Sequence, residues 1–197
     1  MLQTPAQAER PCQIVITGGA GFLGVLLARN LLAAENLAFG GGDPTAIERI
    51  TLVDRVPPPA DLLADVRVRA VTGDLNELLQ ESTSANVVIP ADTALVFHLA
   101  AAVSGECEAD FDLGMRSNLA ATLALLERCR ALKTRPMLVF SSSLAVFGDT
   151  PGQPMPSTLD DNTLPTPQSS YGIQKFMGEQ LVADYARKGL CKAAACA

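Results

Sequence analysis

The sequence contains no tryptophan and a single histidine, His98, among its 197 residues. One histidine cannot complete a usual zinc site, and no two of the five cysteines form a Cys-x-x-Cys pair, so we expect no metal site. The odd number and scattered spacing of the cysteines do not fit a disulfide framework either. We therefore expect reduced thiols in core or surface positions.

Basic residues are in the minority: 15 Lys and Arg stand against 21 Asp and Glu, which gives a formal net charge of -6. Since no basic stripe is visible, nucleic acid is not an expected partner. No apolar run is long enough to cross a bilayer, and residues 1–10 are polar, unlike a signal peptide. We expect a soluble, cytoplasmic protein without a membrane partner, folded as one domain over residues 1–197.

Segments typical of strands and of helices alternate along the chain. Short apolar runs rich in β-branched residues predict strands at 12–17, 50–54, 67–71, 94–99 and 137–140. Helices are expected at 22–34, at 75–80, over most of 108–132, and from Ser169 or Ser170 to about Lys188. The proline-rich segment 150–168 is expected to be an irregular loop. This alternation favours an α/β fold, a Rossmann-type doubly wound parallel sheet with helices on both faces.

Glycines at regular intervals connect the first predicted strand to the first predicted helix. In Thr-Gly-Gly-Ala-Gly-Phe-Leu-Gly at 17–24, Gly18, Gly21 and Gly24 have the spacing Gly-x-x-Gly-x-x-Gly. Glycine permits a tight turn and a close approach of the backbone to a pyrophosphate, and the free amides at a helix start attract phosphates. The position predicts a dinucleotide-binding loop, with a tight turn that binds nothing as the alternative.

Asp54 ends the second predicted strand, where a carboxylate can accept hydrogen bonds from both ribose hydroxyls of NAD and repel the 2′-phosphate of NADP. The glycine-rich loop 39–44 accounts for its long distance from the glycines in sequence. The neighbouring Arg55 complicates the assignment, because an arginine can accommodate a 2′-phosphate. The residue predicts NAD as the cofactor, with a plain surface aspartate as the alternative.

Tyr171 and Lys175 are four residues apart in a predicted helix, so their side chains share one face. An isolated phenol stays protonated at neutral pH, but a nearby ammonium and an oxidised nicotinamide both favour the phenolate. Such a tyrosine can take a hydroxyl proton while hydride leaves to NAD, and a serine at 141–143 can hold the substrate oxygen. Alone, the Tyr-x-x-x-Lys spacing is common on solvated helix faces; the glycine loop, Asp54 and the serine run strengthen it.

In this order the motifs resemble those of the extended short-chain dehydrogenase/reductases, also described as the NAD-dependent epimerase/dehydratase family. The resemblance is carried by 17–24, Gly-Asp-Leu at 73–75, His-Leu-Ala-Ala at 98–101, Ser-Ser-Ser-Leu-Ala-Val-Phe-Gly at 141–148 and the Tyr171–Lys175 pair. It implies a Rossmann-type fold, NAD(P), a small-molecule substrate and a possible homodimer. It leaves open dehydrogenation, epimerisation and dehydration.

Carried over by position, the resemblance also implies the site residues. The catalytic residues would be Ser143, with Ser142 as the fallback, Tyr171 and Lys175. The cofactor, NAD, would be bound by Gly18, Gly21, Phe22, Leu23, Gly24, Asp54, Asp74, Leu75, Ala100, Ala101, Asn118, Tyr171 and Lys175. Of these, Asp74 and Leu75 would contact adenine, and Asn118 would support the geometry of the active site. His98 is expected to be a packed, hydrogen-bonded histidine and not a base.

A narrower resemblance, to the D-erythronate dehydrogenases, rests on residues 103–118, on 142–148 and on Thr-Pro-Gln-Ser-Ser-Tyr-Gly at 166–172. It implies oxidation of the C2 hydroxyl of a four-carbon sugar acid to the 2-oxo acid with NAD, and it makes Ser104 a candidate substrate contact beside Ser143. Two alternatives stay open: a nucleotide-sugar 4-epimerase or dehydratase, and a catalytically impaired cofactor-binding fragment.

Extended members of this family continue with a further strand and a C-terminal portion that closes over the substrate. The segment 189–197 lacks the apolar β-branched run typical of that strand, so we expect an irregular tail and an unpaired sheet edge. Because the cleft would then lack the usual C-terminal substrate portion, we expect NAD binding to survive better than turnover.

Overall fold

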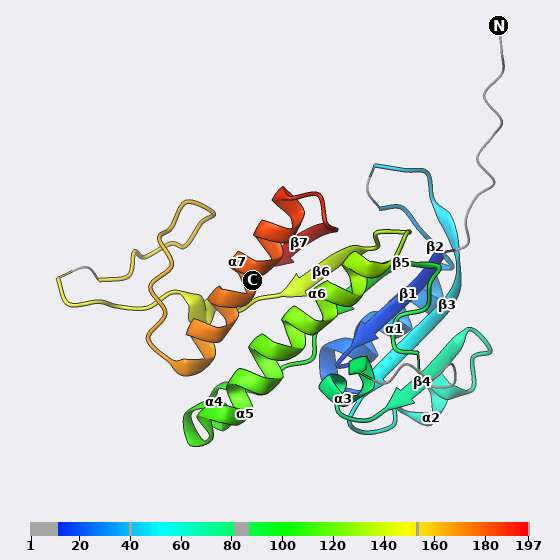
Figure 1. Cartoon of the computed structure of the whole chain (residues 1–197), viewed down its shortest axis with the longest axis horizontal. Coiled ribbons are helices and arrows are strands. Elements are labelled where there is room, and N and C mark those ends of the chain that lie inside the picture. Colours follow the sequence, from blue (N-terminus) through cyan, green and yellow to red (C-terminus); the bar gives the residue numbers. More distant parts are fainter. Residues whose placement is uncertain (1–11, 40, 81–86, 153, 197) are drawn as a thin grey trace, which may run out of the picture.

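The computed structural model describes residues 12–39, 41–80, 87–152 and 154–196 (Figure 1). Its centre is a twisted sheet in which neighbouring strands run in the order β4-β3-β1-β5-β6-β7, with parallel pairing throughout. The strands are β1 (Cys12–Thr17), β3 (Thr45–Asp54), β4 (Val68–Thr72), β5 (Thr93–His98), β6 (Met137–Ser141) and β7 (Lys192–Cys196). A short β2 (Asn36–Leu37) pairs antiparallel with the start of β3.

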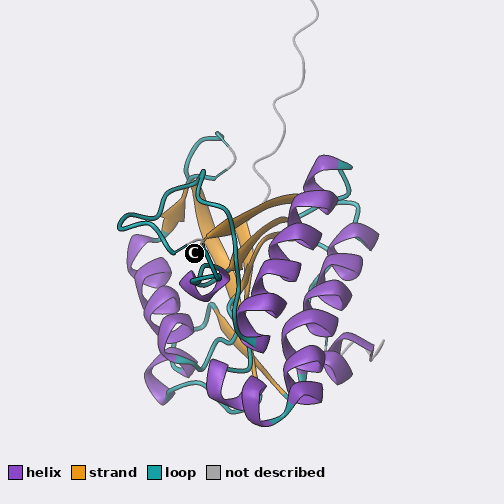
Figure 2. Ribbon diagram, turned by 90° about the vertical axis from the view of Figure 1, so that its left-hand side faces the viewer, coloured by secondary structure: helices purple, strands orange, loops and turns teal. Residues whose placement is uncertain are grey.

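Helices cover both faces of this sheet (Figure 2). They are α1 (Phe22–Ala34), α2 (Ala60–Leu63), α3 (Leu75–Gln80), α4 (Ser104–Ala109), α5 (Phe111–Gly114), α6 (Ala121–Ala131) and α7 (Ser170–Arg187). A π-helical segment, η1 (Met115–Ala120), joins α5 to α6, and a single 3₁₀ turn, η2 (Leu144–Val146), follows β6. None of the helices within the described ranges is long and apolar enough to cross a membrane.

The core consists of two apolar layers, one on each face of the sheet. Successive side chains of a strand point to opposite faces, so Ile14 and Ile16 of β1 pack toward α1, whereas Val15 packs toward α6 and α7. This arrangement explains why the central strands are apolar on both faces and were recognisable in the sequence. The predicted α/β class and doubly wound parallel sheet are confirmed.

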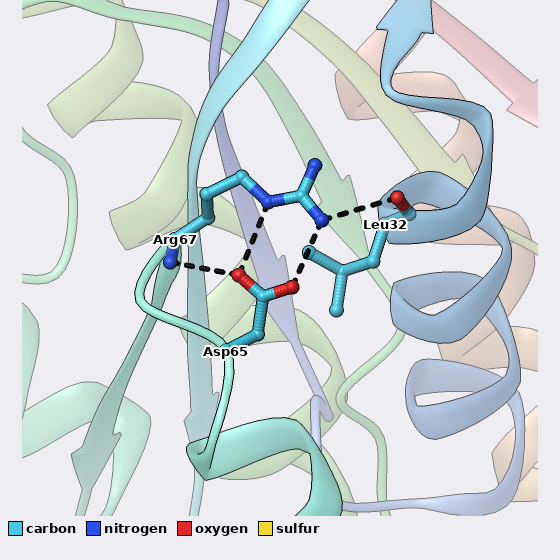
Figure 3. Close-up of polar contacts among 3 residues, drawn as sticks. All are labelled: Leu32, Asp65 and Arg67. Atoms are coloured by element: carbon cyan, nitrogen blue, oxygen red, sulfur yellow. Dashed lines mark hydrogen bonds and ion pairs between the residues drawn. The ribbon is translucent and has the colours of Figure 1, made fainter.

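A partly buried ion pair connects two segments on the α1 side of the sheet (Figure 3). Arg67 donates hydrogen bonds to the carboxylate of Asp65, at 2.8 Å from Nη2 to Oδ2, and from Nη2 to the carbonyl oxygen of Leu32 at 3.1 Å. The hydrogen bonds from Arg67 lower the pKa of the Asp65 carboxyl to about 2. Arg67 thereby ties the last turns of α1 to the turn that enters β4, and it lies just before that strand and not within it.

The prediction for the C-terminal tail was wrong, because residues 192–196 form the strand β7. Its partners in β6 run from Met137, opposite Lys192, to Ser141, opposite Cys196. Backbone hydrogen bonding needs no apolar side chains, and an edge strand that is mostly exposed can consist of lysine and alanine. The open edge of the sheet is consequently β7 and not β6.

The segment 108–132 is helical as expected, but it is not one regular helix. Asp110 interrupts it, where its carboxylate accepts a hydrogen bond from the backbone N–H of Leu113 at 2.9 Å and caps α5. Five residues later, at Met115, the backbone widens into the π-helical turn η1. A helix of this kind is uncommon and is often found at functional sites.

Candidate functional site

A pocket of about 480 Å³ opens where the carboxyl ends of β1 and β5 diverge, the point at which strand order reverses. Most of the residues predicted to bind a cofactor line it, namely Gly18, Gly21, Phe22, Leu23, Gly24, Asp54, Asp74, Leu75, Ala100 and Ala101. The structure therefore brings these residues together at one pocket. Arg55, Asn76, Glu106, Leu113 and Ser117 also line it and were not predicted to bind a cofactor.

The glycine loop lines the pocket, and the surrounding backbone leaves no room for side chains at two of its glycines. Gly18 has a φ of 72°, and a Cβ on it would lie 2.8 Å from the backbone nitrogen of Ala100. A Cβ on Gly24 would overlap the carbonyl oxygen of Gly18. Within the described chain, no side chain caps the N-terminus of α1 and its first turn holds no acidic residue. The backbone amides of this turn are thus available to an anion in the pocket.

Asp54 is fixed at the end of β3 by the backbone. Its Oδ2 accepts a hydrogen bond from the N–H of Ala20 at 2.9 Å, and its Oδ1 accepts one from the N–H of Arg55 at 2.7 Å. A carboxylate oxygen has more than one acceptor site, so each can still receive a hydrogen bond from a ligand hydroxyl. The exposed Arg55 lines the same pocket, so the structure retains the feature that complicated the assignment to NAD.

Asp74 is partly engaged in the fold, since its Oδ1 accepts a hydrogen bond from the N–H of Asn76 at 2.9 Å, at the start of α3. The Asn76 side chain in turn donates to the carbonyl oxygen of Arg116 in η1 at 3.2 Å. This contact joins two walls of the pocket. In the sequence, only the position of Asn76 two residues after Asp74 pointed to a role for it in the pocket. Its partner segment η1 could not be predicted from the sequence.

Lys175 is buried on α7 beside the end of β6. Its Nζ donates to the carbonyl oxygen of Ser141 at 2.8 Å and lies 5.0 Å from the centroid of the Phe140 ring. The Tyr171 ring is one helical turn away, with its centroid 5.7 Å from the same nitrogen. Burial lowers the pKa of the Lys175 ammonium to about 8. The structure therefore brings the predicted tyrosine and lysine together, although neither lines the 480 Å³ pocket.

Ser143 begins the turn η2, and its Oγ accepts a hydrogen bond from the N–H of Ala145 at 3.2 Å. This turn packs against the start of α7, where a Cβ on Gly172 would overlap the carbonyl oxygen of Ala145. Ser143 and Tyr171 thus lie on adjoining segments. The fallback, Ser142, is buried and its hydroxyl donates to the carboxylate of Glu179, a contact that the sequence did not reveal.

Two other predicted site residues, Asn118 and Ser104, do not line the pocket. Asn118 is buried, and its side chain pairs with the backbone of Ala102 instead of lining the pocket. This placement fits a role in supporting the geometry and not a direct contact. Ser104 is exposed at the start of α4, outside the lining of the same pocket.

His98 is a packed, hydrogen-bonded histidine, as predicted. Its Nδ1 lies 2.7 Å from the Thr17 hydroxyl and its Nε2 lies 2.9 Å from the Thr122 hydroxyl. Because Thr122 donates its own proton to the carbonyl oxygen of Asn118 at 2.6 Å, it must accept from Nε2, and the proton of the neutral ring therefore resides there. Burial, and secondarily the charge of Lys175, lower the pKa of His98 to about 3.

Comparison with known protein families matches residues 14–196 to the NAD dependent epimerase/dehydratase family. The chain belongs to this family. That assignment confirms the resemblance carried by the glycine loop, the serine run and the Tyr171–Lys175 pair. Family membership also agrees with the position of the pocket at the switch in strand order.

Among curated relatives, the chain is 53% identical over 178 residues to D-erythronate dehydrogenase of Cupriavidus necator, and 44% identical over 177 residues to that of Haemophilus influenzae. These alignments cover 89% and 90% of this chain but 51% of each relative, so the chain spans about half their length. Among solved structures, the nucleoside-diphosphate-sugar epimerase from Agrobacterium tumefaciens has a TM-score of 0.77 at 34% identity. It is matched over 98% of this chain and 55% of its own.

Proposed function

We propose that this member of the epimerase/dehydratase family binds NAD and forms the cofactor-binding half of a dehydrogenase. The proposed reaction is oxidation of the C2 hydroxyl of a four-carbon sugar acid, such as D-erythronate, to the 2-oxo acid. The observation that carries the proposal is the pocket at the ends of β1 and β5, in which the glycine loop and the fixed carboxylate of Asp54 face one cavity. The substrate class comes from the two dehydrogenase relatives.

The residues present fit a dinucleotide. The uncapped start of α1, where Gly21 and Gly24 carry no side chain, suits a pyrophosphate. Asp54 can accept hydrogen bonds from ribose hydroxyls, and Asp74 and Leu75 bound the part of the pocket proposed for adenine. When bound, NAD supplies the acceptor for the C2 hydrogen and its two electrons.

The chain itself handles the proton of the substrate hydroxyl. Lys175, held on the carbonyl oxygen of Ser141, places an ammonium next to Tyr171 and stabilises its phenolate electrostatically. The phenolate oxygen then takes the C2 hydroxyl proton, and the Ser143 hydroxyl holds the substrate oxygen in place. These roles are proposed for the three residues together, since none of them completes the reaction alone.

A nucleotide-sugar epimerase is the second candidate, and it is favoured by the likeness to the Agrobacterium epimerase across 98% of the chain. An epimerase returns the electrons to its substrate and forms no net NADH. The higher identities of 53% and 44% favour the dehydrogenase.

The test is calorimetric titration of the chain with NAD and with NADP, followed by an absorbance assay for NADH with D-erythronate. We expect NAD to bind more tightly than NADP and Tyr171→Phe to retain NAD binding while abolishing NADH formation. Binding of NAD without NADH formation by the unmodified chain would point to a cofactor-binding unit. Absence of NAD binding would refute the proposal.

We also propose that the chain forms a homodimer through α6 and α7. Leu123 of α6 and Ile173 and Met177 of α7 are apolar side chains that are 41%, 46% and 39% exposed. Burial of such side chains is a usual driving force for association. Sedimentation equilibrium should give twice the mass of the chain, and a monomer at all concentrations would contradict the proposal.

A further inference from the structure

We propose that Gln174 is a positioning residue, which fixes helix α7 relative to the loop 99–102 through the side chain of Asn118. This loop lines the cofactor pocket, and α7 carries the tyrosine and the lysine of the proposed mechanism. The link therefore sets how the pocket and the catalytic side chains meet. The inference rests on the proposed binding of NAD.

The Asn118 amide is locked onto the backbone of one loop residue, Ala102. The N–H of Ala102 donates to Oδ1 of Asn118 at 2.8 Å, and Nδ2 of Asn118 donates to the carbonyl oxygen of Ala102 at 3.2 Å. A backbone N–H can only donate and a carbonyl can only accept, so this pair of contacts permits one orientation of the amide. Asn118 is 3% exposed, so both contacts are shielded from bulk solvent.

The fixed orientation of Asn118 determines that of Gln174. Nδ2 of Asn118 donates to Oε1 of Gln174 at 2.8 Å. If the Gln174 amide were reversed, two donors would face each other, so the oxygen must point toward η1. The result is a continuous polar link from the cofactor loop, through the π-helical segment, to the residue that precedes Lys175.

Gln174 occupies a site that the neighbouring backbone leaves open for it. A Cβ on Gly114 would lie 2.6 Å from Nε2 and 2.8 Å from Oε1 of Gln174, so only glycine leaves room for the amide. Gln174 is 1% exposed, and within the described part of the chain its Nε2 has no acceptor. A buried donor without a partner weakens the fold. The favourable contribution of this side chain therefore lies in the acceptor it offers to Asn118.

A shift of α7 would move the catalytic side chains relative to the bound cofactor. Lys175 follows Gln174 directly, and its Nζ reaches only the carbonyl oxygen of Ser141 among the hydrogen-bond partners described. Tyr171 lies one turn earlier on the same helix. Even a small displacement of these side chains would weaken their contacts with the cofactor, because such contacts depend on alignment. The part of the pocket proposed for the adenosine group is lined by Asp54 at the end of β3 and by Asp74 just before α3, and among the described residues none from α7 lines it.

The experiment compares the affinities of NAD and of ADP-ribose, which lacks the nicotinamide, by calorimetry. In Gln174→Met, which keeps the length of the side chain and removes its oxygen, we expect NAD to bind about fivefold more weakly and ADP-ribose to bind unchanged. Lys175→Met should show the same selective loss. Because Gln174 acts through α7, the double variant should bind NAD no more weakly than Lys175→Met alone.

Two further variants keep the result interpretable. Gln180→Met makes the same substitution at an exposed position of α7 and should change neither affinity. Gly114→Ala displaces the Gln174 amide from the opposite side, and it should reproduce the loss for NAD even if Gln174→Met fails to fold. Three results would overturn the inference. The first is an equal loss of affinity for NAD and for ADP-ribose, and the second is an additive loss of NAD affinity in the double variant. The third is an unchanged ratio of the two affinities in both Gln174→Met and Gly114→Ala. A wild-type chain that binds neither ligand would overturn the proposed function itself, and with it this inference.

Discussion

Acidification should destabilise this protein through one buried group, His98. The folded chain keeps the imidazole neutral down to a pKa of about 3, because burial disfavours the charged ring and Lys175 adds repulsion. In the unfolded chain the ring titrates near its ordinary value of 6.5. Between these values the unfolded state binds more protons than the folded state. Stability is therefore fully present above about pH 6.5 and is lost as the pH falls toward 3.

The size of the effect follows from the two pKa values. Their difference, at about 1.4 kcal/mol per pKa unit, corresponds to about 5 kcal/mol when the titration is complete. At about pH 5 the loss is about 2 kcal/mol, since the unfolded ring is then largely protonated and the folded ring is not. A domain of this size is typically stable by about 5–15 kcal/mol, so the loss is readily measurable.

The assay is urea unfolding, followed by circular dichroism, at neutral pH and at about pH 5, for the wild type and for His98→Gln. Glutamine can accept a hydrogen bond from Thr17 and donate one to Thr122, but it cannot be protonated in this range. Between neutral pH and about pH 5, the free energy of unfolding of His98→Gln should therefore fall by about 2 kcal/mol less than that of the wild type. Because His98 is the only histidine of the chain, its ring signals in a nuclear magnetic resonance spectrum need no assignment. A ring that titrates near 6.5 in the folded protein, or that carries its proton on Nδ1, would refute this reasoning.

Three other substitutions test separate parts of the structure. Asp54→Asn removes the charge that faces a 2′-phosphate, and calorimetry should show the preference for NAD over NADP reduced about tenfold; an unchanged preference would exclude Asp54 as its cause. Burial lowers the pKa of Lys175 to about 8 from 10.5, so the unfolded state binds more protons than the folded state between these pH values. Between about pH 8 and pH 10.5, the free energy of unfolding of the wild type should therefore rise by up to about 3 kcal/mol relative to that of Lys175→Met. Parallel pH profiles of unfolding for these two proteins would contradict that assignment. The Ser169 hydroxyl accepts from the N–H of Gly172 at 3.0 Å and caps α7, so Ser169→Ala should lower the free energy of unfolding by about 1 kcal/mol, whereas the exposed Ser157→Ala should leave it unchanged.

The strands and helices that could be predicted are those whose burial leaves a periodic pattern. Residues 22–34 agree with the structure at both ends, and 12–17 and 75–80 agree at Thr17 and at Leu75, because apolar side chains face a core or caps mark the boundary. The strand β7 could not be predicted, since its exposed alanines are compatible with many conformations and only the free edge of β6 selects the extended one. The π-helical turn at 115–120 likewise depends on packing and not on local preference.

The candidate site shows the same division. Glycines, an aspartate at a strand end and a tyrosine four residues before a lysine are recognisable because the chemistry constrains their types and spacing. Asn118 was expected only from the family resemblance, and Gln174 carries no such signal, since isolated amides occur at many surface positions. Their role follows from contacts between residues 56 positions apart.

By itself, the sequence determined the class of fold, and it predicted most of the residues that line the pocket proposed for the cofactor. It did so because burial and phosphate binding impose local patterns that survive without knowledge of the whole chain. Only the tertiary structure decided that the tail forms a strand, that His98 stays neutral, and that Gln174 joins α7 to the cofactor loop. These features depend on burial and on hydrogen bonds between residues that are far apart in the sequence. Such hydrogen bonds leave no pattern in the local sequence from which they could be predicted.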